Sequence, residues 1–132
     1  MQILKNITIK GSAGRNMLVD VFYYKNNKAK PCVIFCHGFK GFKDWGHFNY
    51  VGERFAAEEC VFVKFNFSHN GTTVQDPFNF SDLEAFGHNN FSKELEDLNH
   101  VIDWLLNHSE LQSEIDPEKL GLLGHSRGGA IA

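Results

Sequence analysis

The chain has 132 residues, enough for one domain with a single core and too few for two. Hydrophobic residues make up 42% and charged residues 22%, a balance typical of a soluble globular protein rather than a disordered or membrane-spanning one. With a net charge of −3 and interspersed signs, the sequence has no basic stripe to neutralise phosphates, so nucleic acid is not an expected partner.

The amino terminus and the cysteines bear on the cellular compartment. Residues 1–5 turn polar too early for a signal peptide, and no apolar run approaches ~18 residues, so no membrane partner is expected. Cys32, Cys36 and Cys60 lie in or beside apolar, strand-like runs, which favours buried free thiols over disulfides. These features predict a cytoplasmic protein.

The first part of the chain predicts a hairpin. Apolar and polar residues roughly alternate over residues 2–10 and 17–24, and the Gly11–Gly14 segment between them is typical of a turn. The 13 phenylalanines of the whole chain predict either a bulky core or an apolar surface that awaits a substrate or further chain.

A parallel crossover is expected next. Residues 32–36 form a continuous apolar run, typical of a strand covered on both faces. Residues 46–59 carry apolar side chains at helical spacing, and residues 61–65 form another buried strand. Strand, helix and strand in this order indicate two parallel strands.

The second part of the chain continues the alternation after a long loop at residues 68–90. Ser92 is expected to cap a helix, and Asp116–Pro117 to close the connection that follows it. A short strand at 120–123 then leads through Ser126 into a last helix. The expected apolar face of the long helix comprises Leu95, Leu98, Val101, Ile102, Leu105 and Leu106. The fold class is thus α/β: a mostly parallel sheet of about five strands with flanking helices and an amino-terminal antiparallel hairpin.

The run Gly124–His125–Ser126–Arg127–Gly128 follows a strand and opens a helix. This G-x-S-x-G arrangement is typical of a nucleophile elbow, a sharp turn that exposes a serine hydroxyl above the sheet edge. A side chain in place of Gly124 or Gly128 would crowd the neighbouring strand or helix. Ser126 is therefore the candidate nucleophile, with the two glycines as its structural support.

A second motif, His37–Gly38–Phe39, follows the strand at 32–36. With the elbow it resembles the α/β-hydrolase superfamily, and the likeness spans nearly the whole chain as the amino-terminal portion of that fold. The resemblance implies that the backbone N–H groups of Phe39 and Arg127 form an oxyanion hole, while Ser126 attacks the substrate carbonyl.

Two further segments narrow the resemblance. Residues 65–71 and 90–98 look like the dienelactone-hydrolase, feruloyl-esterase and serine-aminopeptidase-like branches. The implied substrates are small esters or amides, with esters favoured by frequency.

The sequence also bears on the roles of the histidines and on whether a metal or cofactor is bound. His37 is interpreted as a structural residue whose imidazole orders the oxyanion loop; the alternative is that it carries a proton in the reaction. His125 flanks Ser126, but its side chain is expected to point away from the serine. No metal-binding spacing occurs, and residues 38–41 lack the pattern of a dinucleotide loop, so neither metal nor cofactor is expected. The remaining histidines, expected on solvated surface, are His47, His69, His88, His100 and His108.

The long loop carries the aromatic residues Phe78, Phe80 and Phe86 among acidic ones. They are candidates for substrate binding, as the wall or lid of an acyl pocket. An ordinary acidic loop that buries aromatic rings explains the pattern equally well.

The catalytic acid and histidine of the superfamily follow the serine in the chain, and only six residues follow Ser126. We therefore expect residues 1–132 to be a single, carboxy-terminally truncated hydrolase domain, nearly inactive alone. The strand at 120–123 would then expose an edge to the missing half of the fold or to a self-association partner. Two functions remain open: a serine esterase, possibly an amidase, or a non-catalytic module that binds a ligand or partner.

Overall fold

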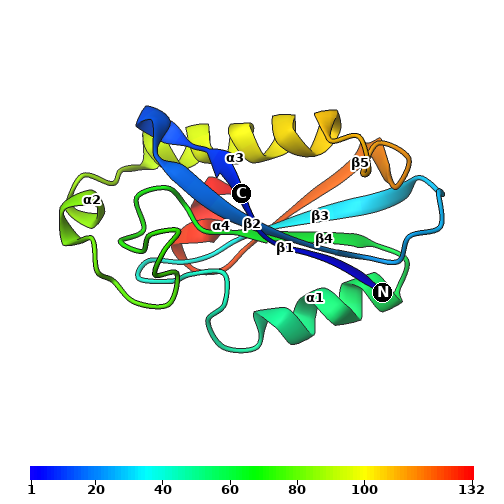
Figure 1. The fold of residues 1–132 in the computed structure, drawn as a ribbon, viewed down its shortest axis with the longest axis horizontal. Helices are drawn as coiled ribbons and strands as arrows, with labels where there is room; N and C mark the ends of the chain where they lie inside the picture. The colour runs from blue at the N-terminus through cyan, green and yellow to red at the C-terminus, as the bar shows by residue number, and fades with distance from the viewer.

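A computed structural model describes residues 1–132 as a five-stranded sheet with helices on both faces (Figure 1). The strands are β1 (Gln2–Lys10), β2 (Asn16–Tyr23), β3 (Lys30–Cys36), β4 (Val61–Phe65) and β5 (Ile115–Gly124). The helices are the 3₁₀ turn η1 (Ser12–Gly14), α1 (Phe48–Ala57), α2 (Leu83–Gly87), α3 (Phe91–Asn107) and α4 (Arg127–Ile131). None of them combines the length and the apolar character that a bilayer crossing requires.

The sheet has the strand order β1-β2-β4-β3-β5 and is mixed. β3 pairs in parallel with both β4 and β5, whereas β2 pairs antiparallel with both β1 and β4. The expected α/β class, parallel crossover and amino-terminal hairpin are all present. Half of the sheet is antiparallel because the hairpin joins the parallel strands through β2.

The β1–β2 hairpin contains one irregularity, a bulge in β1. Its register shifts between Leu4 and Ile7, and Asn6 within this bulge has φ 54°. An asparagine tolerates this left-handed conformation better than most residues. The backbone N–H of Asn6 consequently turns inward and donates to Asp20 on β2.

Two boundaries in the second half of the chain differ from the expectation. The long helix begins at Phe91 rather than after Ser92, because Asn90 is the residue with extended backbone and its side chain accepts from the Lys93 N–H. The segment 68–90 is not a continuous loop, since it contains α2, capped by the Asp82 side chain.

The last strand is also longer than expected. Asp116 and Pro117 lie inside β5 instead of in the connection before it. β5 is an edge strand that pairs only with β3, and its register is irregular between the Lys30 and Cys32 pairings, where Pro117 lies. An edge position tolerates a proline because no N–H is needed there.

The main core lies between the sheet and α3, and a smaller one lies under α1. Leu98, Val101 and Leu105 are the buried residues of the expected α3 face, whereas Leu95 is half exposed. Cys32 and Cys36 are buried free thiols, and burial raises the pKa of each to about 12. Phenylalanines occur both in the core, as with Phe62 and Phe65, and on the surface, as with Phe39 and Phe78.

Candidate active site

Ser126 occupies the turn between the end of β5 and the start of α4, with φ 56° and ψ −121°. A non-glycine residue in this region costs on the order of 1–3 kcal/mol and persists only where its surroundings enforce it. The residue is exposed and lines a cavity of about 280 Å³. The surroundings of the turn therefore hold the Ser126 hydroxyl at an accessible concave surface, at the cost of backbone strain.

The glycines on either side of Ser126 permit this turn. A Cβ atom at Gly128 would collide with the backbone carbonyl of Cys36 at the end of β3, and one at Gly124 would collide with the backbone of α4 at Gly128 and Gly129. Strand β5, helix α4 and strand β3 are thus packed backbone to backbone. No larger residue fits at either glycine without a shift of the main chain.

The loop after β3 packs directly against the Ser126 turn. A Cβ atom at Gly38 would lie 3.0 Å from both the Cβ of Ser126 and the carbonyl oxygen of His125. The two sequence motifs therefore meet in space. The next residue, Phe39, lines the same cavity, and its backbone N–H donates to no protein acceptor. Such a free donor beside a serine can bind a developing oxyanion.

His37 connects the backbone of this loop to the segment after β4. The Phe67 N–H donates to Nε2 over 3.1 Å, so Nδ1 carries the proton and donates to the Gly38 carbonyl over 2.9 Å. Burial lowers the pKa of His37 to about 4, so the ring is neutral at physiological pH. Because both ring nitrogens bind backbone groups, His37 is not available to the Ser126 hydroxyl.

Arg127 is held by helix α3. Its Nε donates to Glu94 over 2.6 Å, and its guanidinium lies 4.1 Å from the centroid of the Phe91 ring. Burial raises the pKa of Glu94, and the hydrogen bond from Arg127 opposes that rise. The side chain of the residue after Ser126 is thus fixed against α3.

The other histidines supply no base to Ser126. His125 is exposed, its backbone N–H donates to the Cys36 carbonyl, and its ring lies 6.2 Å from that of Trp45. No hydrogen bond joins a histidine to the Ser126 hydroxyl. His69 is buried rather than solvated, and its Nδ1 lies 2.7 Å from the Ser68 hydroxyl. No group of three or more histidine, cysteine or acidic side chains is arranged to hold a metal ion.

The aromatic residues of the long loop approach the cavity on the Phe39 side. The Phe86 ring lies 5.4 Å from that of Phe39, and Phe80 and Phe86 line a second, apolar cavity of about 240 Å³. Lys40 borders both cavities. Phe78 lies outside them and packs edge-on against Phe42. Two of the three candidate substrate-binding rings are thus next to the serine cavity.

Sequence reasoning missed one part of this region, a buried ionic network under the loop after β3. Lys43 and Lys64 are completely buried and pair with Asp20 and Asp44. A lysine inside the apolar run of β4 was the signal, because a charged residue in a fully buried strand requires a partner.

No protein-family model and no curated protein sequence matches the chain. Among solved structures, esterase Est22 is 18% identical with a TM-score of 0.72, and the match covers 98% of this chain and 36% of that one. Est1E from Butyrivibrio proteoclasticus with bound ferulic acid is 20% identical with a TM-score of 0.73, covering 95% and 44%. The thermophilic carboxylesterase EstE1 is 18% identical with a TM-score of 0.69, covering 99% and 39%.

The chain therefore has the fold of the amino-terminal part of an α/β-hydrolase, as the sequence resemblance implied. It spans 36–44% of the length of these structures. At this level of identity the likeness concerns the fold.

Proposed function

We propose that residues 1–132 are the amino-terminal part of a single hydrolase domain that cleaves carboxylic esters, with Ser126 as its nucleophile. The observation that carries the proposal is the strained Ser126 turn packed against Gly38 at the edge of a cavity. A serine needs this exposure and a nearby oxyanion donor to attack a carbonyl carbon.

In the proposed reaction the Ser126 oxygen adds to the ester carbonyl, and the backbone N–H groups of Phe39 and Arg127 stabilise the negative oxygen that forms. Loss of one such donor in serine hydrolases typically costs about 2.7–4 kcal/mol. The proton of Ser126 passes to a histidine oriented by an acidic residue, and both lie outside these 132 residues. His37 and Glu94 support the two donors, since they hold the neighbouring Gly38 carbonyl and the Arg127 side chain.

The substrate is proposed to be a small-molecule ester with an apolar acyl group. The apolar cavity lined by Phe80 and Phe86 lies next to the serine cavity and offers room for such a group. Phe78 lies outside this cavity, against Phe42. The structural neighbours include the esterase Est22 and Est1E with bound ferulic acid, which accords with this choice. Amides remain a secondary substrate class. Three free cysteines accord with a cytoplasmic enzyme, and neither nucleic acid nor membrane has a role in the proposal.

The outer edge of β5 is proposed to bind the rest of the domain. β5 pairs with β3 alone, and Leu122 and Leu123 are 42% and 39% exposed although they lie in a strand. An unpaired apolar edge of this kind binds another strand. Size-exclusion chromatography tests the idea: residues 1–132 alone should self-associate, and Leu122→Lys should reduce this, whereas the intact protein should not respond to the same change.

A fluorophosphonate probe tests the nucleophile in the intact protein. Ser126→Ala should abolish labelling, while Ser81→Ala, a change at an exposed serine of the long loop, should leave it intact. An unlabelled wild type, or labelling that survives Ser126→Ala, would reject the enzyme and favour a ligand-binding module. A series of nitrophenyl esters of rising acyl length then measures acyl preference, and Phe86→Ala should shift it.

A further inference from the structure

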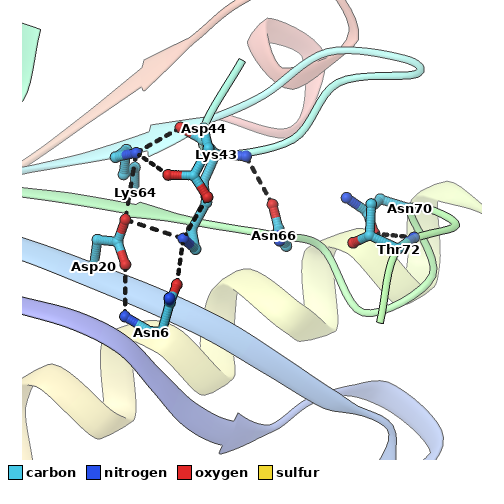
Figure 2. A network of polar contacts seen from close by, with 8 residues as sticks. All are labelled: Asn6, Asp20, Lys43, Asp44, Lys64, Asn66, Asn70 and Thr72. Atoms are coloured by element: carbon cyan, nitrogen blue, oxygen red, sulfur yellow. Dashed lines mark hydrogen bonds and ion pairs between the residues drawn. The ribbon is translucent and has the colours of Figure 1, made fainter. Parts of the chain in front are cut away.

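A buried network of two lysines and two aspartates joins the loop of residues 37–47, which contributes Lys43 and Asp44, to Asp20 on β2 and Lys64 on β4 (Figure 2). We propose that Lys43, Lys64, Asp20 and Asp44 are positioning residues that hold the Phe39 N–H in place for oxyanion binding. The proposal rests on the proposed ester hydrolysis and adds four residues that touch no substrate.

Each lysine binds both aspartates. Lys43 Nζ lies 3.1 Å from Asp20 Oδ2 and 2.7 Å from Asp44 Oδ2. Lys64 Nζ lies 3.3 Å from Asp20 Oδ2 and 3.0 Å from Asp44 Oδ1. Asn6, at the bulge of β1, completes the network, because its side chain accepts from Lys43 and its backbone N–H donates to Asp20 (Figure 2).

The network is dry and electrically balanced. The side chains of Lys43, Lys64 and Asp20 are 0% exposed and that of Asp44 is 3% exposed. Burial alone would raise the pKa of Asp44, but hydrogen bonds and charges from both lysines bring that pKa below its ordinary value. Two positive and two negative charges compensate one another. Removal of any one charge leaves another without a partner in a site that water does not reach.

Two strands of the sheet thereby fix one side of the loop. Lys64 on β4 donates to the backbone carbonyl of Lys43 over 2.7 Å, and the side chain of Asn66 accepts from the backbone N–H of Lys43 over 2.7 Å. Asn70 donates to the Gly41 carbonyl over 3.2 Å. The loop backbone is therefore held at three groups, all within four residues of Phe39.

The fixed side of the loop connects to Phe39 through a tight turn. Gly41 N–H donates to the Gly38 carbonyl over 2.9 Å, and Lys40 has φ 58°. The Phe39 N–H lies inside this turn, so its direction depends on where Gly41 and Gly38 are held. His37 binds the Gly38 end, and the ionic network holds the chain at Lys43, two residues beyond the Gly41 end. Small displacements of catalytic groups can cost up to about 10²-fold in rate.

The test compares Lys64→Met with Lys30→Met in the intact protein. Lys30 also forms a buried pair, with Glu114 over 2.7 Å, but at the opposite end of β3 from the loop. Both variants lose a buried ammonium, so a general loss of stability affects both. Lys64→Met should lower kcat for a nitrophenyl ester about tenfold or more with KM within about twofold, and Lys30→Met should leave kcat within about twofold. Equal losses in the two variants, or an unchanged kcat in Lys64→Met, would overturn the proposal.

Amide hydrogen exchange supplies a measurement that does not depend on activity. Exchange in residues 38–45 should be faster in Lys64→Met than in Lys30→Met, and equal rates would overturn the proposal even if both enzymes are active. If the wild type has no esterase activity, the proposed function fails while this readout still tests the loop. Should Lys64→Met not fold, Asp20→Asn is the replacement, because it keeps the shape of the side chain, with Glu114→Gln as its control and the same two outcomes.

Discussion

Arg127 and Glu94 join the short helix after the candidate nucleophile to the long helix α3, through a 2.6 Å hydrogen bond from Nε to a carboxylate that is 3% exposed. Because this bond is charged and largely shielded from water, Glu94→Ala should destabilise the intact protein by about 1.5–3 kcal/mol. Glu94→Gln should cost less, since it keeps an acceptor and removes a carboxylate whose pKa burial raises. Urea unfolding measures both values.

Glu96 on the same helix is the control for that prediction. It faces His100 across 3.7 Å at the surface, with side chains 57% and 41% exposed. Glu96→Ala should therefore change the free energy of unfolding by less than about 0.5 kcal/mol. Similar losses for Glu94→Ala and Glu96→Ala would mean that the Arg127 contact adds nothing to stability.

Gly128→Ala should prevent the α4 turn from closing, because the new Cβ would collide with the main chain of β3 at Cys36. We expect a loss of about 3 kcal/mol or more, or failure to fold, by thermal unfolding. Gly129→Ala is the adjacent control: its Cβ would meet only the Gly124 carbonyl, at 3.8 Å. In a helix, alanine should be neutral there or stabilise by up to about 1 kcal/mol. The opposite ranking of the two variants would contradict the close backbone packing of α4 against β3.

Ser126→Gly should separate backbone strain from chemistry. Glycine adopts φ 56° and ψ −121° without a steric penalty from Cβ. The free energy of unfolding of the variant should therefore be about 1 kcal/mol higher than that of the wild type, while fluorophosphonate labelling is lost. Ser126→Ala should also lose labelling but keep the strain. A glycine variant no more stable than the alanine variant, by thermal unfolding, would mean that the turn is not strained.

The lowered pKa of His37 predicts that the protein loses stability in mild acid. A histidine in an unfolded chain has a pKa of about 6.5, whereas burial lowers that of His37 to about 4. Between these values the unfolded chain binds a proton that the folded chain does not, so the contribution is complete above about pH 6.5 and falls as the pH drops towards 4. The gap between the two pKa values corresponds to roughly 3 kcal/mol.

Urea unfolding at several pH values measures that effect. His37→Asn should flatten the fall in stability between about pH 6.5 and pH 4, whereas His47→Asn, at an exposed position, should keep the slope of the wild type. If His37→Asn loses stability with falling pH as steeply as the wild type, another group carries the pH dependence. His69, also buried and with a pKa lowered by burial, is then the next to replace.

Continuous apolar runs made the centre of the fold predictable. Residues 32–36 and 61–65 are strands because each run is buried on both faces, and strong periodicity located α3. Cap and turn residues were less informative. Asn90 and Ser92 both suit a helix start, and only the backbone conformation distinguishes them. Asp116–Pro117 has the composition of a turn, but its edge position lets it remain in β5.

The order of the two motifs predicted that Gly38 and Ser126 would meet, since the carboxyl ends of parallel strands lie at one edge of a sheet. The burial of His69 and the pairing of Lys43 with Asp20 were not predictable in this way. Both depend on contacts between residues far apart in sequence. Neither residue type is distinguishable from a surface residue by its local pattern, and only Lys64, inside an apolar strand, gave a local sign.

The balance of charges under the loop also constrains how the sequence can evolve. A single replacement at Asp20, Asp44, Lys43 or Lys64 leaves a lone charge in a dry site, whereas an apolar set of similar volume would be tolerated or even more stable. Homologous sequences should therefore carry either all four ionic residues or a wholly uncharged set. Intermediate combinations should be rare, so the four positions are expected to covary across relatives.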